Sequence, residues 1–123
     1  MREVYMTRKE IEEKTGATYM ENAQIKSVRL GFEDHGLLTL DISLRLGDCI
    51  GTCYGGWNMT NNPKGMSAIG ELLKAMKVNS LNELEETYCR TLSTGNSCGD
   101  RVMAIGHIIE DSWFSFLEFF KRP

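Results

Sequence analysis

The sequence predicts an α+β domain in which a five-stranded antiparallel sheet carries its helices on one face. Three observations lead to this prediction. Apolar and polar residues alternate with period two through residues 24–46, as in half-buried strands. A helical stripe follows at residues 66–76, and two more strand-like runs follow at 88–92 and 101–109. The resulting order, β-β-β-α-short α-β-β, is typical of α+β proteins.

The first 22 residues form a charged arm in this interpretation, and residues 23–123 form the single domain. Thr7-Arg8-Lys9-Glu10 has the form of a capping box, and Gly16 is placed to end the short helix that it starts. Only Ile11 is apolar between residues 7 and 16, so this helix has little face to bury. We expect a peripheral arm that a partner subunit would order.

Three strands come next. Val28, Leu30 and Phe32 share one face, a polar turn occupies residues 33–36, and the second strand alternates cleanly through residues 38–46. Residues 49–59 are a third strand, interrupted by Gly51, Gly55 and Gly56. Glycines at such places indicate a bulge, or close approach by a backbone or a ligand.

The second half of the chain begins with a helix that Asn62 caps and Pro63 opens. A shorter helix starts at Ser80, and residues 88–92 are the fourth strand. The fifth strand, residues 101–109, is apolar on both sides, as in a central strand covered on both faces. Five aromatic residues between 113 and 120 either close the core or face another subunit, which predicts a homodimer or a higher homo-oligomer.

Composition limits the function. The net charge of −3 argues against binding to long nucleic acid. No apolar run reaches membrane-spanning length and no signal peptide is evident, so we expect a cytoplasmic protein. The four cysteines, at positions 49, 53, 89 and 98, match zinc-site spacing poorly, which predicts four free thiols and no metal.

Residues suited to catalysis are few. Asp34 and His35 beside Gly36 offer either an acid–base pair or a stabilised turn, and the turn is favoured. His107, among apolar neighbours, is predicted to be a hydrogen-bonded core histidine. The sequence therefore predicts a protein that is not an enzyme and uses no cofactor, with a small hydrolase using His35 as a remote alternative.

A ligand site is more strongly indicated. A hairpin would bring Arg90 near Arg101 with Asn96 between them, and arginines offer forked donors for phosphate. Trp57 or Tyr54 would stack on a base. In the alternative, both arginines pair with Glu85, Glu86 or Asp100 on the surface, and spacing alone favours this alternative. The predicted ligand-binding set is Arg90, Arg101, Asn96, Trp57, Tyr54 and Met103.

Four segments carry a family resemblance: residues 25–40 (IKSVRLGFEDHGLLTL), 54–56 (YGG), 88–90 (YCR) and 104–114 (AIGHIIEDSWF). Together they resemble a family of small phage and prophage proteins, the Thoeris anti-defence nucleotide sponges, over residues 24–120. The segment between Gly56 and the helix is shorter than in many relatives, and the charged arm is an addition.

The resemblance implies a non-enzymatic protein, active in the cytoplasm of an infected bacterium. Such a protein would sequester a cyclic form of ADP-ribose that a bacterial immune system makes. It also implies an oligomer with pockets near subunit contacts, and in some relatives separate sites for cyclic oligonucleotides. Arg90 matches the arginine expected after the aromatic residue of the fourth strand. The alternative is a protein-binding inhibitor of a bacterial defence complex, comparable to an anti-CRISPR protein.

Overall fold

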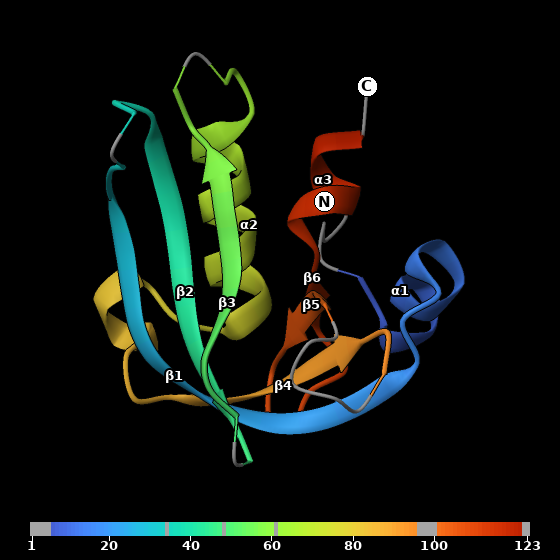
Figure 1. Cartoon of the computed structure of the whole chain (residues 1–123). Helices are drawn as coiled ribbons and strands as arrows, with labels where there is room; N and C mark the ends of the chain where they lie inside the picture. Colours follow the sequence, from blue (N-terminus) through green and yellow to red (C-terminus); the bar gives the residue numbers. More distant parts are fainter. Residues whose placement is uncertain (1–5, 34, 48, 61, 96–100, 122–123) are drawn as a thin grey trace.

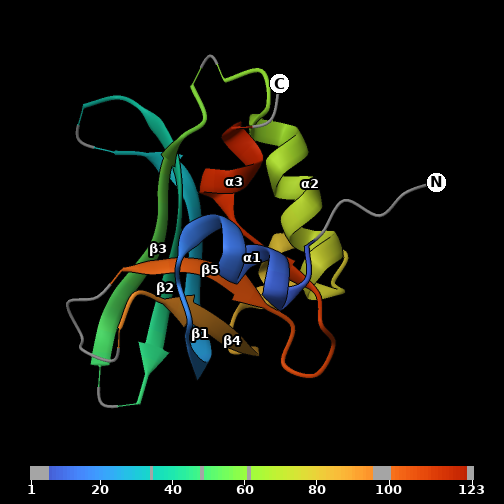
Figure 2. The ribbon, with the colours of Figure 1, turned by 90° about the vertical axis from the view of Figure 1, so that its right-hand side faces the viewer.

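The computed structural model describes residues 6–33, 35–47, 49–60, 62–95 and 101–121. These residues form an α+β fold with an antiparallel six-stranded sheet in the order β3-β2-β1-β4-β5-β6. The elements are α1 (Arg8–Thr15), β1 (Tyr19–Phe32), β2 (Leu38–Leu46), β3 (Cys49–Asn58), α2 (Gly65–Met76), the 3₁₀ helix η1 (Leu81–Leu84), β4 (Tyr88–Ser93), β5 (Val102–Gly106), β6 (Trp113–Phe114) and α3 (Phe116–Lys121). Figures 1 and 2 show the sheet curling strongly from β3 to β6.

The long strand β1 connects the two halves of the sheet. Its first part, Tyr19 to Gln24, pairs with β4, and its second part, up to Phe32, pairs with β2. A register shift between Ile25 and Ser27 marks the irregularity between these parts. β1 begins at Tyr19, so the strand crosses the division that the sequence suggested at residue 22.

Helices cover both faces of the sheet, whereas the sequence predicted one face. The main core joins α2 to the inner sides of β1, β2 and β3 through residues such as Leu72, Leu40 and Ile42. A second cluster joins α1 to the opposite side of β4 and β5, where the fully buried Ile11 packs with Leu92 and Ala104. One apolar residue was therefore enough to attach α1, because the sheet offers a complementary apolar patch.

The N-terminal segment is docked on its own chain. The capping box at Thr7 and the left-handed Gly16 are confirmed as the two ends of α1. The backbones of Met6 and Trp113 exchange hydrogen bonds of 3.0 and 2.8 Å, and the Arg8 N–H donates to Asp111 Oδ1 at 2.7 Å. These contacts hold the described part of the arm against its own chain.

The C-terminal aromatic residues lie in this chain's own core. Trp113, Phe114 and Phe116 are buried, and Phe119 and Phe120 pack against the main cluster. Trp113 and Phe114 also form β6, the strand that the sequence did not predict. β5 is therefore central as predicted, since it lies between β4 and β6 with cores on both faces. The aromatic rings no longer give a reason to expect a second subunit.

The start of α2 differs from the prediction. α2 begins at Gly65, and the Asn62 side chain accepts from the Lys64 N–H (3.0 Å) in the preceding turn instead of capping the helix. None of the helices among the described residues is long and apolar enough to cross a membrane.

Candidate functional site

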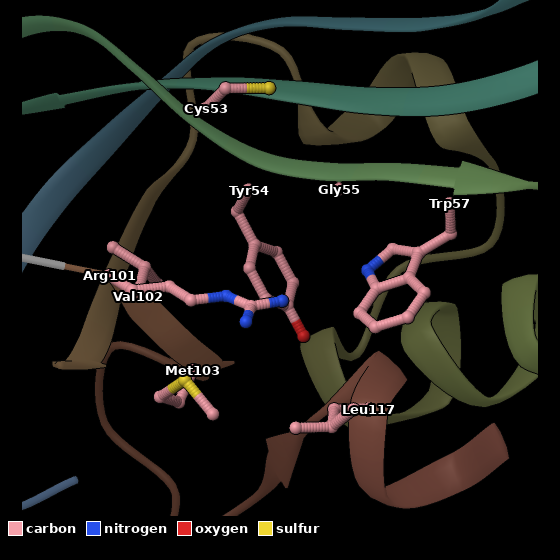
Figure 3. Close-up of a pocket in the computed structure, with 8 residues that line it drawn as sticks. All are labelled: Cys53, Tyr54, Gly55, Trp57, Arg101, Val102, Met103 and Leu117. Atoms are coloured by element: carbon pink, nitrogen blue, oxygen red, sulfur yellow. The ribbon is translucent and has the colours of Figure 1, made fainter. Parts of the chain in front are cut away.

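A pocket lies where the curl of the sheet brings β3 towards β5. We call it the β3–β5 pocket, and it is lined by Cys53, Tyr54, Gly55, Trp57, Arg101, Val102, Met103 and Leu117. Water-sized molecules can occupy only about 50 Å³ of it, whereas the hollow including its open mouth measures about 330 Å³. Four of the six predicted ligand-binding residues, Arg101, Trp57, Tyr54 and Met103, therefore meet in one place (Figure 3).

A bulge in β3 brings the two aromatic residues to the same side. Leu40 pairs with Trp57 while Asp41 pairs with Gly55, so β3 has one extra residue at this point. Without it, Tyr54 and Trp57 would alternate to opposite faces. Gly55 has a φ of 134°, and a Cβ there would lie 2.4 Å from the Leu40 carbonyl oxygen. Only glycine fits this backbone, so the bulge predicted from the glycines is confirmed.

Tyr54 forms the floor of the pocket and cannot stack on a ligand base. It is buried, with its ring 5.5 Å from that of Phe116. Its hydroxyl donates to the Phe114 carbonyl (3.3 Å) and accepts from the Phe116 N–H (2.9 Å). Burial raises the pKa of the phenol, partly offset by the Phe116 N–H, Ser115 and the charge of Arg101. Tyr54 therefore stays neutral and fixes the start of α3 against β3.

Arg101 provides an available positive charge at the pocket mouth. The residue directly precedes β5 and is exposed. Its side chain extends across Tyr54 in Figure 3, and within the described residues its guanidinium has no hydrogen-bond or ion-pair partner. An unpaired guanidinium keeps its forked donors free for a phosphate or carboxylate.

Trp57 provides the flat surface. Its indole is half-buried and rests on Phe116 and Phe120, with ring centroids 6.1 and 5.6 Å apart. Met103 and Leu117, both half-buried, form the opposite wall. A cation beside an aromatic and apolar surface suits a ligand with an anionic group and a flat ring.

Cys53, Gly55, Val102 and Leu117 also line the pocket and were not predicted from the sequence. The Gly55-Gly56 pair was the available signal, since a bulge there places Tyr54 and Trp57 together. Cys53 is not an activated nucleophile, because burial, the charge of Asp41 and a hydrogen bond to Asp41 (Sγ to Oδ1, 3.8 Å) raise the pKa of its thiol.

Arg90 lies away from this pocket. Arg90 pairs with Gly106 and Ser93 with Val102, so Arg90 and Arg101 are about four strand positions apart, roughly 13 Å. The Arg90 guanidinium donates to the carbonyls of His107 (Nε, 2.8 Å) and Glu110 (Nη2, 2.7 Å), and its Cζ is 5.1 Å from the centre of the Trp113 ring. The predicted clamp of two adjacent arginines is therefore not formed. Arg90 instead holds the β5–β6 connection.

The remaining predicted residues have other positions. Asn96 and Asp34 lie outside the described residues. His35 is exposed in the β1–β2 turn, where the Glu33 carboxylate accepts from the Leu37 N–H at 3.3 Å. His107 Nδ1 accepts from the N–H groups of Ile109 (3.1 Å) and Glu110 (3.0 Å), so it stabilises a turn.

The prediction of four free thiols is wrong. Cys49 is disulfide-bonded, while Cys53 and Cys89 are free. Cys98 lies outside the described residues. Within the described residues, no three His, Cys, Asp or Glu side chains are grouped so that they could hold a metal ion.

A second hollow lies on the outer side of the sheet, where Arg45 and Tyr88 flank the amides of Asn22 and Gln24. It is more open than the β3–β5 pocket, and water-sized molecules can occupy about 230 Å³ of it, against about 50 Å³ of the β3–β5 pocket. Comparisons with protein-family models, with curated proteins and with solved structures find no match. The case for a function therefore depends on the sequence resemblance and on the geometry of the β3–β5 pocket.

Proposed function

We propose that this protein binds a cyclic nucleotide signal of the ADP-ribose type in the β3–β5 pocket and sequesters it without cleavage. The protein would act as a phage anti-defence sponge in the bacterial cytoplasm. The observation that carries the proposal is the Arg101 guanidinium, which has no partner in the described part of the chain, beside the half-buried Trp57 ring. In this site Arg101 holds a phosphate, Trp57 stacks on a ring, and Met103 and Leu117 exclude water from the far side.

The size of the pocket limits how the nucleotide is held. Ligand pockets usually measure about 300–1,000 Å³. The hollow reaches that range only with its open mouth included, at about 330 Å³. The inner part therefore suits one phosphate or the edge of one ring, and the rest of the nucleotide lies across the mouth.

The groups that line the pocket support binding without cleavage. The Cys53 thiol has a raised pKa, the Tyr54 phenol is buried with both hydrogen bonds satisfied, and neither described histidine lines the pocket. Among the described lining residues, none is a general base or an activated nucleophile.

Calorimetric titration with a cyclic ADP-ribose tests the site. Loss of a charge-assisted hydrogen bond is worth about 1.5–3 kcal/mol, so Arg101→Ala should weaken binding roughly ten- to hundredfold. Arg101→Lys should recover only part of the loss, because lysine lacks the planar fork. The control is Arg45→Ala, which removes an exposed arginine from the second hollow. Unchanged affinity in Arg101→Ala, or a loss confined to Arg45→Ala, would place the ligand elsewhere.

A further inference from the structure

One edge of β1 is left without a strand partner. β4 pairs with β1 only from Tyr19 to Gln24. The backbone hydrogen bonds of Ile25 with Glu86 and Thr87 extend this pairing by one residue. From Val28 to Phe32, β1 pairs with β2 on one side and with no described strand on the other. This part of β1 is the outermost strand at the left of Figure 1.

Backbone groups along this edge point outwards. The Glu33 N–H donates to the Leu37 carbonyl (2.9 Å), so these two residues are a hydrogen-bonded pair. Hydrogen-bonded pairs recur at every second residue of an antiparallel ladder, so Gly31 and Arg29 also direct their backbone N–H and C=O groups to β2. Val28, Leu30 and Phe32 consequently direct theirs away from the sheet. The Arg29 side chain supports this direction, because its Nη2 donates to the Phe32 carbonyl at 2.9 Å. The edge can therefore accept another strand.

The same residues leave apolar side chains uncovered. Val28 packs against the main core, and Leu30 and Phe32 follow it on the same face. Leu30 is 43% exposed and Phe32 is 66% exposed. The core face of β1 therefore continues beyond Val28 in two exposed apolar side chains.

The edge is complementary to itself. If a two-fold axis passes beside Leu30, that residue faces the partner's Leu30, and Val28 faces the partner's Phe32. On the other face, Arg29 lies opposite the partner's Gly31, which leaves space for the guanidinium, and diagonal to the partner's Glu33. Diagonal neighbours are within reach of long side chains, so opposite charges meet on one face while apolar residues meet on the other.

We propose that the occupant of this edge is a second copy of the same chain, which forms a homodimer by antiparallel β1–β1 pairing around Leu30. The two six-stranded sheets then join into one continuous sheet. Arg29 releases the Phe32 carbonyl to the partner's Val28 N–H and turns to the partner's Glu33. This inference goes beyond the proposed function, because the edge lies on the far side of β2 from the β3–β5 pocket.

Disulfide trapping tests the register. Facing residues of an antiparallel pair have Cα atoms about 5.5 Å apart, within the range of about 4.4–6.8 Å that a disulfide spans. Leu30→Cys should therefore form a covalent dimer under mild oxidation at least ten times faster than Ile109→Cys, both in a Cys53→Ser background. Ile109 is a suitable control because it is 80% exposed and lies outside the edge. Equal rates would indicate random collision and overturn the proposal.

Sedimentation equilibrium tests the association itself. The unmodified chain should be a dimer at micromolar concentration. Leu30→Lys places two like charges face to face and should raise the dissociation constant at least tenfold, whereas Ile109→Lys should leave it unchanged, with equal melting temperatures confirming folding. A monomeric wild-type chain would overturn the proposal. A dimer whose dissociation constant is unchanged by Leu30→Lys would also overturn it, as would an edge strand that binds only a different protein.

The same variants separate this inference from the proposed function. Nucleotide depletion by a monomeric Leu30→Lys chain would show that the sponge works without the β1 interface. A dimer that never depletes nucleotide would support the interface and contradict the sponge.

Discussion

Replacement of Arg90 by alanine should destabilise the fold. The substitution removes two hydrogen bonds from a charged donor, to the carbonyls of His107 and Glu110, and the contact with the Trp113 ring. A hydrogen bond with a charged group is worth about 1.5 kcal/mol at the low end, and a partly exposed cation–π contact about 0.5–1 kcal/mol. Since the bond to Glu110 is exposed and contributes less, we expect a loss of about 2–3 kcal/mol in the free energy of unfolding.

Thermal and urea denaturation measure this effect. For a domain of this size, about 2–3 kcal/mol lowers the melting temperature by roughly 6–15 °C. Arg90→Lys should recover little, because an ammonium cannot reach two carbonyls and cover the ring together. Arg45→Ala is the matched control, since Arg45 is exposed and has no partner among the described residues. A melting temperature unchanged in Arg90→Ala, together with lost nucleotide affinity, would refute this assignment and return Arg90 to the binding site.

Three other predictions concern glycines, thiols and pH. Gly55→Ala should lower the free energy of unfolding by about 2–4 kcal/mol, because it combines a strained positive φ with a clash against the Leu40 carbonyl. Gly70→Ala on α2 should raise the free energy of unfolding by about 0.5–1 kcal/mol, because a Cβ at Gly70 meets no atom within 4 Å. In native protein a thiol reagent should label the exposed Cys53, whereas Cys89 should react only after denaturation and Cys49 only after reduction. Burial raises the pKa of the Cys89 thiol to about 12 from an ordinary 9.0. Between these two pH values the unfolded chain releases a proton that the folded chain keeps, so the free energy of unfolding should fall as pH rises. In Cys89→Ala this fall should be less steep.

Local patterns predicted most of the fold. Period-two alternation identified β1 and β2, and the capping box with Gly16 identified α1, because these signals depend on neighbouring residues alone. The failures involve long-range packing. Ile11 looked insufficient to hold α1, and the patch of Leu92 and Ala104 that receives it becomes visible only once β4 and β5 are paired.

The candidate site shows the same division. Sequence reasoning named Arg101, Trp57, Tyr54 and Met103 as ligand-binding residues, and the structure brings these four together at one pocket. It placed Arg90 with them because a hairpin was expected to bring both arginines to one end, but the register puts Arg90 opposite Gly106. Register depends on pairing across strands, which spacing along one strand does not determine.

The most direct test of the account is a depletion and release experiment. Purified protein in molar excess is incubated with a cyclic ADP-ribose, free nucleotide is measured after filtration, and the protein is then boiled. The account predicts that free nucleotide disappears, that boiling returns it chemically intact, and that Arg101→Ala removes less of it. Release of a hydrolysed product would show an enzyme instead of a sponge, and nucleotide that is never depleted would contradict the proposed function altogether.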